Sequence, residues 1–210
     1  MENRLKEGGK AFNPTAQHPY GYTRGIMLLL EAVNTCLSAL GEARVTSTEV
    51  RHPTVDLIKN TVEMKKRSLL ERGLWFNDSE VTMYPGTDGT LEYPEDALSV
   101  LGYGGEILIP RKGLLFDVDN NTGVFTEPKK LHVVYNVDFA DLPECVANVV
   151  MYRSMREVYA GDLGVDAAVQ NMQQNELAAM AQVEMLHLRN KRFSSRSRKG
   201  WVRLQNALRG

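Results

Sequence analysis

Residues 69–77 read Leu-Leu-Glu-Arg-Gly-Leu-Trp-Phe-Asn, and the pattern of the sequence changes on either side of them. Before this stretch, apolar residues recur with the 3.6-residue period of amphipathic helices. After it, short apolar runs alternate with clusters of Gly, Pro and Asp, as in strands joined by turns. The stretch therefore marks a corner between a helical part and a strand part.

The corner is predicted to end a helix that begins near Pro53. Pro suits a first helical turn, and Gly73 suits the position beyond a helix, where a left-handed conformation costs glycine little. Trp75 and Phe76 can each bury about 150–250 Å². We expect a core cluster here that joins the two parts, and we assign this structural role to the residues of the corner: Arg72, Gly73, Trp75, Phe76 and Asn77.

Length and charge set broad limits. A chain of 210 residues fits one domain, or one domain with an insertion. The 25 Lys and Arg against 26 Asp and Glu give a net charge of −1, which produces no overall field for nucleic acid or membrane. No apolar run approaches the ~20 residues needed to span a bilayer, and the N-terminus lacks a signal-peptide core. We expect a soluble protein made in the cytoplasm, with Cys36 and Cys145 as buried free thiols.

The predicted fold class is α+β: an antiparallel bundle of about four helices with an inserted antiparallel β-sheet or small barrel. The predicted segments are an extended N-terminal arm (1–22), a helical hairpin (23–77), the β insertion (78–140), a helical half completing the bundle (141–193) and a basic C-terminal tail (194–210). The strands are expected around residues 81–83, 107–109, 114–116, 124–125 and 131–135.

The second helical half has three expected features. Asp141 and Glu144 resemble a capping box, and Gly161 is expected to close the helix that follows. A long last helix is predicted from about Val165 to Arg192. Its apolar side is predicted to include Val165, Ala168, Met172, Leu177, Met180, Met185 and Leu188.

The end of the chain is strongly basic. The last 22 residues carry eight positive charges and no acidic residue, so the other 188 carry 17 positive and 26 negative charges. One hypothesis is that this tail binds a nucleic-acid backbone. The favoured one is that it docks in a groove of an acidic protein, because Trp201 and nearby aliphatic residues exceed what phosphate contact requires. The candidate partner-binding residues are Arg196, Arg198, Lys199, Trp201 and Arg203.

No motif in the sequence indicates a particular chemical reaction. Asp117, Asp119 and Asn121 have the spacing of a calcium loop, but the glycine stands at 123 and Pro128 takes the place of the final Glu, so a hairpin turn is the better interpretation. The four histidines are scattered. We therefore predict no catalytic residue, no metal and no cofactor. Carboxylate pairs such as Glu92 and Glu95 leave a glycosidase as the alternative.

Several pieces of the chain, in order, are similar to one known family. They are Ala32-Val33-Asn34 with Leu37, Leu40, Gly41, Glu42 and Val45; Arg72 to Asn77; Arg111 with Leu115-Phe116-Asp117 and Asn121-Thr122; and Leu142-Pro143-Glu144 with Arg153. Together they resemble the tail tubular protein A family, the head-to-tail adaptors of short-tailed, autographivirus-type bacteriophages. The chain departs from the pattern at Leu74, where the family often has Trp, and the tail beyond Phe193 matches nothing in it.

The resemblance implies a structural protein of the virion tail, not an enzyme. Family members form a twelvefold ring below the portal, with the tubular nozzle protein (tail tubular protein B) beneath and tail fibres at the side, and DNA passes through the ring. The helical part would form the ring and touch the portal, and the basic tail would bind the portal or a neighbouring subunit. The alternatives are a polysaccharide- or envelope-degrading tail hydrolase, or a nucleic-acid-binding protein acting through the basic tail.

Overall fold

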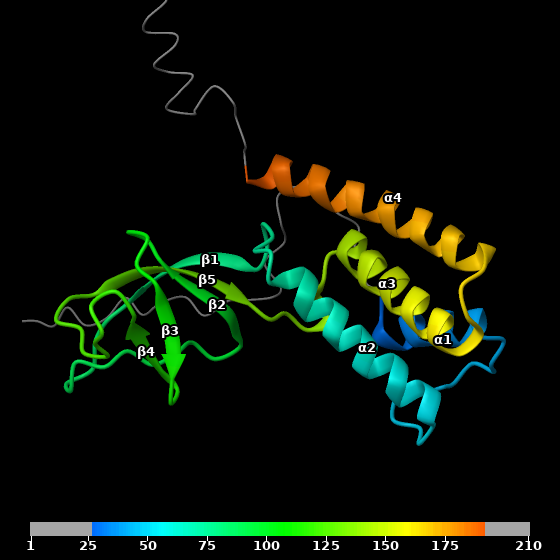
Figure 1. The fold of residues 1–210 in the computed structure, drawn as a ribbon, viewed down its shortest axis with the longest axis horizontal. Helices are drawn as coiled ribbons and strands as arrows, with labels where there is room; N and C mark the ends of the chain where they lie inside the picture. The colour runs from blue at the N-terminus through cyan, green and yellow to red at the C-terminus, as the bar shows by residue number, and fades with distance from the viewer. Residues whose placement is uncertain (1–26, 192–210) are drawn as a thin grey trace, which may run out of the picture.

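The structure is a computed structural model that describes residues 27–191. The expected N-terminal arm and basic tail lie outside the described residues. Four α-helices pack together in one part of the molecule and the strands form the other (Figure 1). The helices are α1 (Leu29–Ala39), α2 (Pro53–Leu70), α3 (Glu144–Leu163) and α4 (Ala167–Asn190), and a short 3-10 helix, η1 (Phe139–Asp141), precedes α3. The strands are β1 (Asp78–Met83), β2 (Ala97–Gly102), β3 (Leu108–Arg111), β4 (Leu114–Asp117) and β5 (Lys129–Tyr135).

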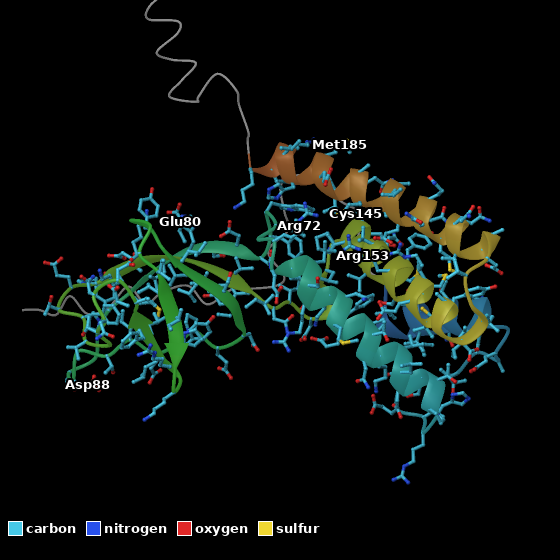
Figure 2. All side chains as sticks on the ribbon, viewed as in Figure 1. Arg72, Glu80, Asp88, Cys145, Arg153 and Met185 are labelled. Atoms are coloured by element: carbon cyan, nitrogen blue, oxygen red, sulfur yellow. The ribbon has the colours of Figure 1, made fainter. Side chains whose placement is uncertain are left out.

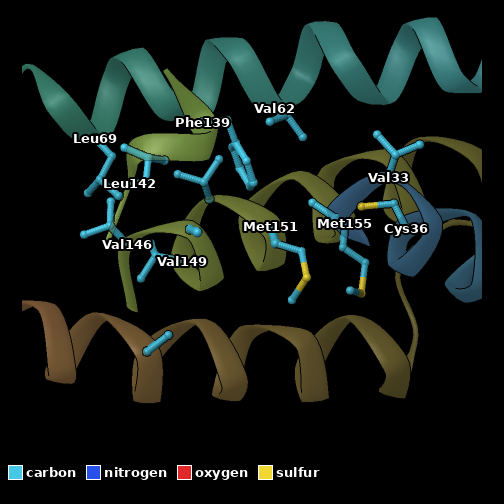
Figure 3. Packing of buried hydrophobic residues seen from close by; sticks show 14 of the residues in the cluster. Val33, Cys36, Val62, Leu69, Phe139, Leu142, Val146, Val149, Met151 and Met155 are labelled. Carbon is cyan, nitrogen blue, oxygen red and sulfur yellow. The ribbon is translucent and has the colours of Figure 1, made fainter. Parts of the chain in front are cut away.

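Helix α3 is the centre of the helical part. It packs against α4 on one side and against α1 and α2 on the other, as Figure 3 shows. Because it is covered on both sides, its buried residues are not confined to one stripe. They include Val146, Val149, Val150, Met155 and Val158. The helical core is therefore one continuous cluster that runs through all four helices.

The capping box predicted at Asp141 and Glu144 is wrong. Asp141 lies in η1, and Pro143 occupies the N-cap of α3 with no side-chain hydrogen bond. Glu144 instead uses its Oε2 atom to accept the backbone N–H of Met27 at 3.0 Å. This carboxylate ties the entry of α1 to the start of α3, a contact that no local pattern indicates.

The helix ends follow local backbone chemistry. Helix α2 begins at Pro53 as expected, and Gly73 has a φ of +67°. Gly161 does not close α3, because the helix continues to Leu163 and ends at Gly164, whose φ is +86°. Helix α1 starts at Leu29 and α4 at Ala167, later than the expected starts near residues 23 and 165. The start of α4 is set by the Asp166 carboxylate, which accepts the N–H groups of residues 168 and 169.

The apolar side predicted for α4 is split between two faces. The buried stripe that contacts α3 consists of Val169, Met172, Glu176, Ala179 and Val183. Leu177, Met185 and Leu188, which were predicted to share a side with Met172, are exposed instead. Within residues 27–191, α3 packs along the first set, and Arg72 and Trp75 contact the C-terminal half of α4, so the second set is left exposed.

The strands confirm the α+β class and form two antiparallel sheets. One has the order β1-β5-β2, and the other is the β3-β4 hairpin. In the larger sheet Ser79 pairs with Val133 and Val81 with Leu131. The described strands do not close into a single barrel.

Two strand predictions differ from the structure. Val124 and Phe125 form no strand, although Phe125 is buried and its N–H donates to the carbonyl of Gly89 at 2.7 Å. Strand β2 was not predicted. Its pairing with β5 is irregular between Ala97 and Ser99, so the simple alternation of a strand is broken there.

Within residues 27–191, none of the helices combines the length and the apolar character that crossing a bilayer requires.

Candidate functional site

The corner is held by one buried amide side chain. Asn77 is 1% exposed. Its Oδ1 atom accepts the N–H of Leu74 at 2.8 Å, and its Nδ2 atom donates to the carbonyls of Leu70 at 3.0 Å and Tyr135 at 2.8 Å. The Tyr135 N–H donates back to the Asn77 carbonyl at 2.8 Å. The last turn of α2 and the end of β5 are therefore tied to the same residue.

The aromatic residues of the corner lie at the edge of the core. Leu74 is buried, whereas Trp75 and Phe76 are only partly buried. Their rings meet edge to face, with centroids 5.2 Å apart, and the Trp75 ring lies 6.4 Å from that of His187 on α4. Trp75 therefore contacts α4 from the edge of the core. It does not fill the core between the helical part and the β part.

Helix α4 is linked to both sides of the corner by charge. The Arg72 guanidinium lies 3.7 Å from the Glu184 carboxylate, and Figure 2 shows Arg72 between α2 and α4. At the end of α4, Lys191 forms an ion pair with Asp78, the first residue of β1. The sequence did not indicate these links, because the paired residues lie more than 100 positions apart.

A small cavity lies where α4 crosses the corner. Its volume is about 260 Å³. Leu74, Met180, Val183 and Leu188 form its apolar wall, while Arg72 and Glu184 supply charges. The cavity holds no set of groups arranged for a reaction.

His187 lines this cavity. Its Nδ1 atom is buried and has no hydrogen-bond partner within residues 27–191. Burial, followed by the positive charges of Lys191 and Arg72, lowers the pKa of His187, and Asp78 only partly opposes this. The imidazole is therefore neutral at pH 7.

The lowered pKa of His187 predicts a pH dependence of stability. Below the ordinary histidine pKa of about 6.5, the unfolded chain binds a proton that the folded chain resists, so stability falls as the pH drops. Chemical denaturation at pH 7.5 and pH 5.5 should show a larger loss for the wild-type chain than for His187→Gln. Equal losses in the two proteins would mean that His187 is not desolvated in the folded state.

The carboxylates of Asp117, at the end of β4, and Asp119, in the loop that follows, accept hydrogen bonds from N–H groups of the protein. Asp117 is buried and accepts the backbone N–H of Asn120 at 3.0 Å and its side-chain N–H at 2.9 Å. These hydrogen bonds hold the pKa of Asp117 below its usual value. Asp119 points to the N–H of Ile107. No three potential metal ligands come together anywhere in residues 27–191.

Within residues 27–191, the cysteines and the carboxylate pair Glu92 and Glu95 are not arranged as a catalytic group. Cys36 and Cys145 are free and buried, as predicted, and burial raises the pKa of the Cys36 thiol to about 12. Both are therefore protonated at neutral pH and poorly nucleophilic. Glu92 and Glu95 are exposed in the loop between β1 and β2.

A buried charge cluster joins α3 to α4, and the sequence analysis missed it. The Glu176 carboxylate lies 2.7 Å from Arg153 Nε and 3.2 Å from Arg156 Nη2, and only 8% of the Glu176 residue is exposed. Figure 2 shows Arg153 between the two helices. One feature of the sequence could have indicated this cluster: Glu176 is a single acidic residue within an otherwise uncharged stretch of α4.

The candidate partner-binding residues Arg196, Arg198, Lys199, Trp201 and Arg203 all lie outside the described residues.

Comparisons with known proteins give one consistent result. Residues 30–193 match the family described as "Tail tubular protein". The chain is 36% identical over 167 residues to "Tail tubular protein A" of Klebsiella phage KP34, a match that covers 79% of this chain and 90% of that protein. The matched region includes α1 from its second residue onward, the other three described helices, the five described strands and the corner between the two parts.

Proposed function

Because the chain belongs to the tail tubular protein family and is a structural component of a bacteriophage tail, we propose that it is the ring-forming adaptor between the portal and the tubular nozzle. Copies of the chain surround the path of the DNA, in a twelvefold ring. Its partners are the portal protein, the nozzle protein (tail tubular protein B), the tail fibres and further copies of itself. The role needs no reaction and no cofactor.

The observation that best supports this proposal is the corner where hydrogen bonds and ion pairs join two dissimilar parts. An adaptor must present one surface to the component above and another to the component below, and must hold the two in fixed register. Here Asn77 bonds to both α2 and β5, and Lys191 and Arg72 connect α4 to either side of the same corner. In this proposal the helical part forms the ring and touches the portal, while the β part faces the nozzle and the fibres.

The charge distribution agrees with DNA passing through without being read. The region outside the last 22 residues carries a net charge of −9, which repels phosphates and does not hold them. The chain is made in the host cytoplasm and functions in the tail of the virion.

The basic tail supplies a direct test of portal docking. Deleting residues 194–210 should leave the melting temperature nearly unchanged and weaken binding to purified portal. Trp201→Ala should reproduce most of the loss, since buried Trp and Arg side chains dominate such contacts. Added salt should weaken the wild-type complex through the arginine and lysine charges. Binding is measured by sedimentation of portal with labelled adaptor.

Two results would redirect the proposal. If the truncated chain binds portal as well as the full chain does, the tail is not the anchor. If the full chain instead shifts DNA on a gel in a steeply salt-dependent way, the tail binds nucleic acid. Release of sugars from host polysaccharide by the purified chain would contradict a purely structural role.

A further inference from the structure

The last two turns of α4 are held to the molecule differently from the rest of the helix. The side chains that α4 buries are those of Val169, Met172, Glu176, Ala179 and Val183. From residue 184 to residue 190 no residue is fully buried, and only Leu186 and His187 are partly buried. Figure 1 shows this end of α4 reaching past α3 toward β1. A segment with so few buried contacts can open while the rest of the fold stays intact.

His187 is the residue through which these turns meet the corner. Its ring lies 6.4 Å from the ring of Trp75, and it lines the cavity of about 260 Å³. Its Nδ1 atom is buried and has no hydrogen-bond partner within residues 27–191. An imidazolium carries an N–H on both ring nitrogens, and each of them needs an acceptor or water. The docked position therefore accommodates the neutral ring and resists the charged one.

The charged side chains around His187 are already paired with one another. Arg72 at the corner pairs with Glu184 at 3.7 Å, and Lys191, one turn beyond His187, pairs with Asp78 of β1. A proton on His187 adds a third positive charge that competes for these two carboxylates. Release of the turn gives the ring access to water. The end of the helix favours a positive charge in either state, so it does not oppose release.

We propose that His187 is a proton-sensitive latch: protonation of its imidazole releases residues 184–190 from the corner, while the earlier turns of α4 remain on α3. The released state accepts the proton that the docked state resists, so release becomes more favourable as the pH falls below the ordinary histidine pKa of about 6.5. Because the chain continues from Lys191 into the basic tail, the latch also controls the point from which the tail leaves. The latch operates within a single chain and needs neither a ring nor a portal.

Hydrogen exchange of the full chain, read by mass spectrometry on peptides, tests the latch. Protection of a peptide covering residues 184–191 should fall at least about threefold between pH 7.5 and pH 5.5, after correction for the pH dependence of intrinsic exchange. The upper limit is about tenfold, set by a released histidine with a pKa of about 6.5. A peptide covering residues 167–179 should change less than about twofold. In His187→Gln, whose side chain is polar but does not titrate, neither peptide should show the fall.

His132 supplies the matched control. It is a second histidine beside the corner, and its Nδ1 atom lies 3.6 Å from Oδ1 of Asp78. Histidines ordinarily change charge in this pH range. Because Asp78 also pairs with Lys191, a charge on His132 acts on the end of α4 through that carboxylate. His132→Gln should nevertheless keep the wild-type fall in protection.

Trp75 reports the same event in a second measurement. Trp201→Phe leaves Trp75 as the single tryptophan of the chain. Release of α4 exposes more of the Trp75 ring to water, so its emission should move to longer wavelength between pH 7.5 and pH 5.5 and return on neutralisation. Adding His187→Gln should remove this shift.

The expected result is a loss of protection that is confined to the end of α4 and that requires His187 but not His132. An equal loss along the whole of α4 would overturn the latch, because His187 would then act only on overall stability. The latch is also wrong if the loss persists in His187→Gln, disappears in His132→Gln, or is absent from the wild-type chain at pH 5.5.

Discussion

Asn77→Ala is expected to lower the free energy of unfolding by about 3 kcal/mol, because it leaves buried backbone groups without partners at about 1–3 kcal/mol each. The affected groups are the Leu74 N–H and the carbonyls of Leu70 and Tyr135. The bond to Tyr135 is the one that crosses from the helical part to the β part. Urea denaturation followed by circular dichroism and by tryptophan fluorescence should show this loss, and the two probes should separate if the parts uncouple.

Two neighbouring variants make the test specific. Asn77→Asp keeps an acceptor for Leu74 but places a buried carboxylate against the carbonyls of Leu70 and Tyr135, so at neutral pH it should cost at least as much as Asn77→Ala. Trp75→Ala should cost about 1–2 kcal/mol, less than the 3–5 kcal/mol of a fully buried aromatic, because the ring is only partly buried. A loss below 1 kcal/mol for Asn77→Ala would show that water replaces its hydrogen bonds and that the corner is not rigid.

Glu176→Ala is expected to cost about 2–3 kcal/mol, since removing one partner of a buried ion cluster leaves the others uncompensated. The figure is below the upper range for such clusters because Arg153 and Arg156 are partly exposed and can still reach water. The loss should appear as a lower urea midpoint, and Glu176→Gln, which keeps a hydrogen-bond acceptor, should lose less.

The matched control for Glu176 lies on the same helix. Glu184 also faces an arginine, but both side chains of the Arg72–Glu184 pair are at least half exposed. Exposed pairs contribute about 0–1 kcal/mol, so Glu184→Ala should be nearly neutral. Similar losses for the two variants would mean that the Glu176 cluster is screened by solvent and does not hold α4 against α3.

Local pattern was enough to predict much of the fold. Helix α2 begins at Pro53, and Gly73 takes the left-handed conformation, because both depend only on backbone chemistry at one residue. Strand β2 escaped prediction because its pairing is irregular at Ala97 to Ser99. Phe125 was taken for a strand residue because burial alone makes a short apolar run resemble one.

The position of the corner could be predicted from the sequence, but the residues that bond to it could not. The corner was visible as a break in periodicity, but its partners are distant in sequence. Tyr135 is 58 residues from Asn77, and Lys191 is 113 residues from Asp78. Glu144 was assigned to a local cap, whereas its carboxylate bonds to Met27. A single sequence carries no periodic signal for such long-range polar contacts.

The two faces of α4 illustrate the same limit of prediction from a single sequence. Its apolar residues were read as one side, because a long helix with many apolar positions fits more than one stripe. The structure assigns Met172 and Val183 to α3 and leaves Leu177, Met185 and Leu188 exposed. The absence of exposed charge between residues 167 and 183 is the sequence feature that sets this stretch apart from the usual charged surface of a helix that faces water.

Electron microscopy of the purified chain mixed with its portal protein tests the central claim most directly. The account predicts a closed ring of twelve copies on the portal, with the helical parts packed side by side and the β parts projecting from the opposite end. An isolated two-fold dimer on the portal, or a chain that does not bind portal at all, would contradict it.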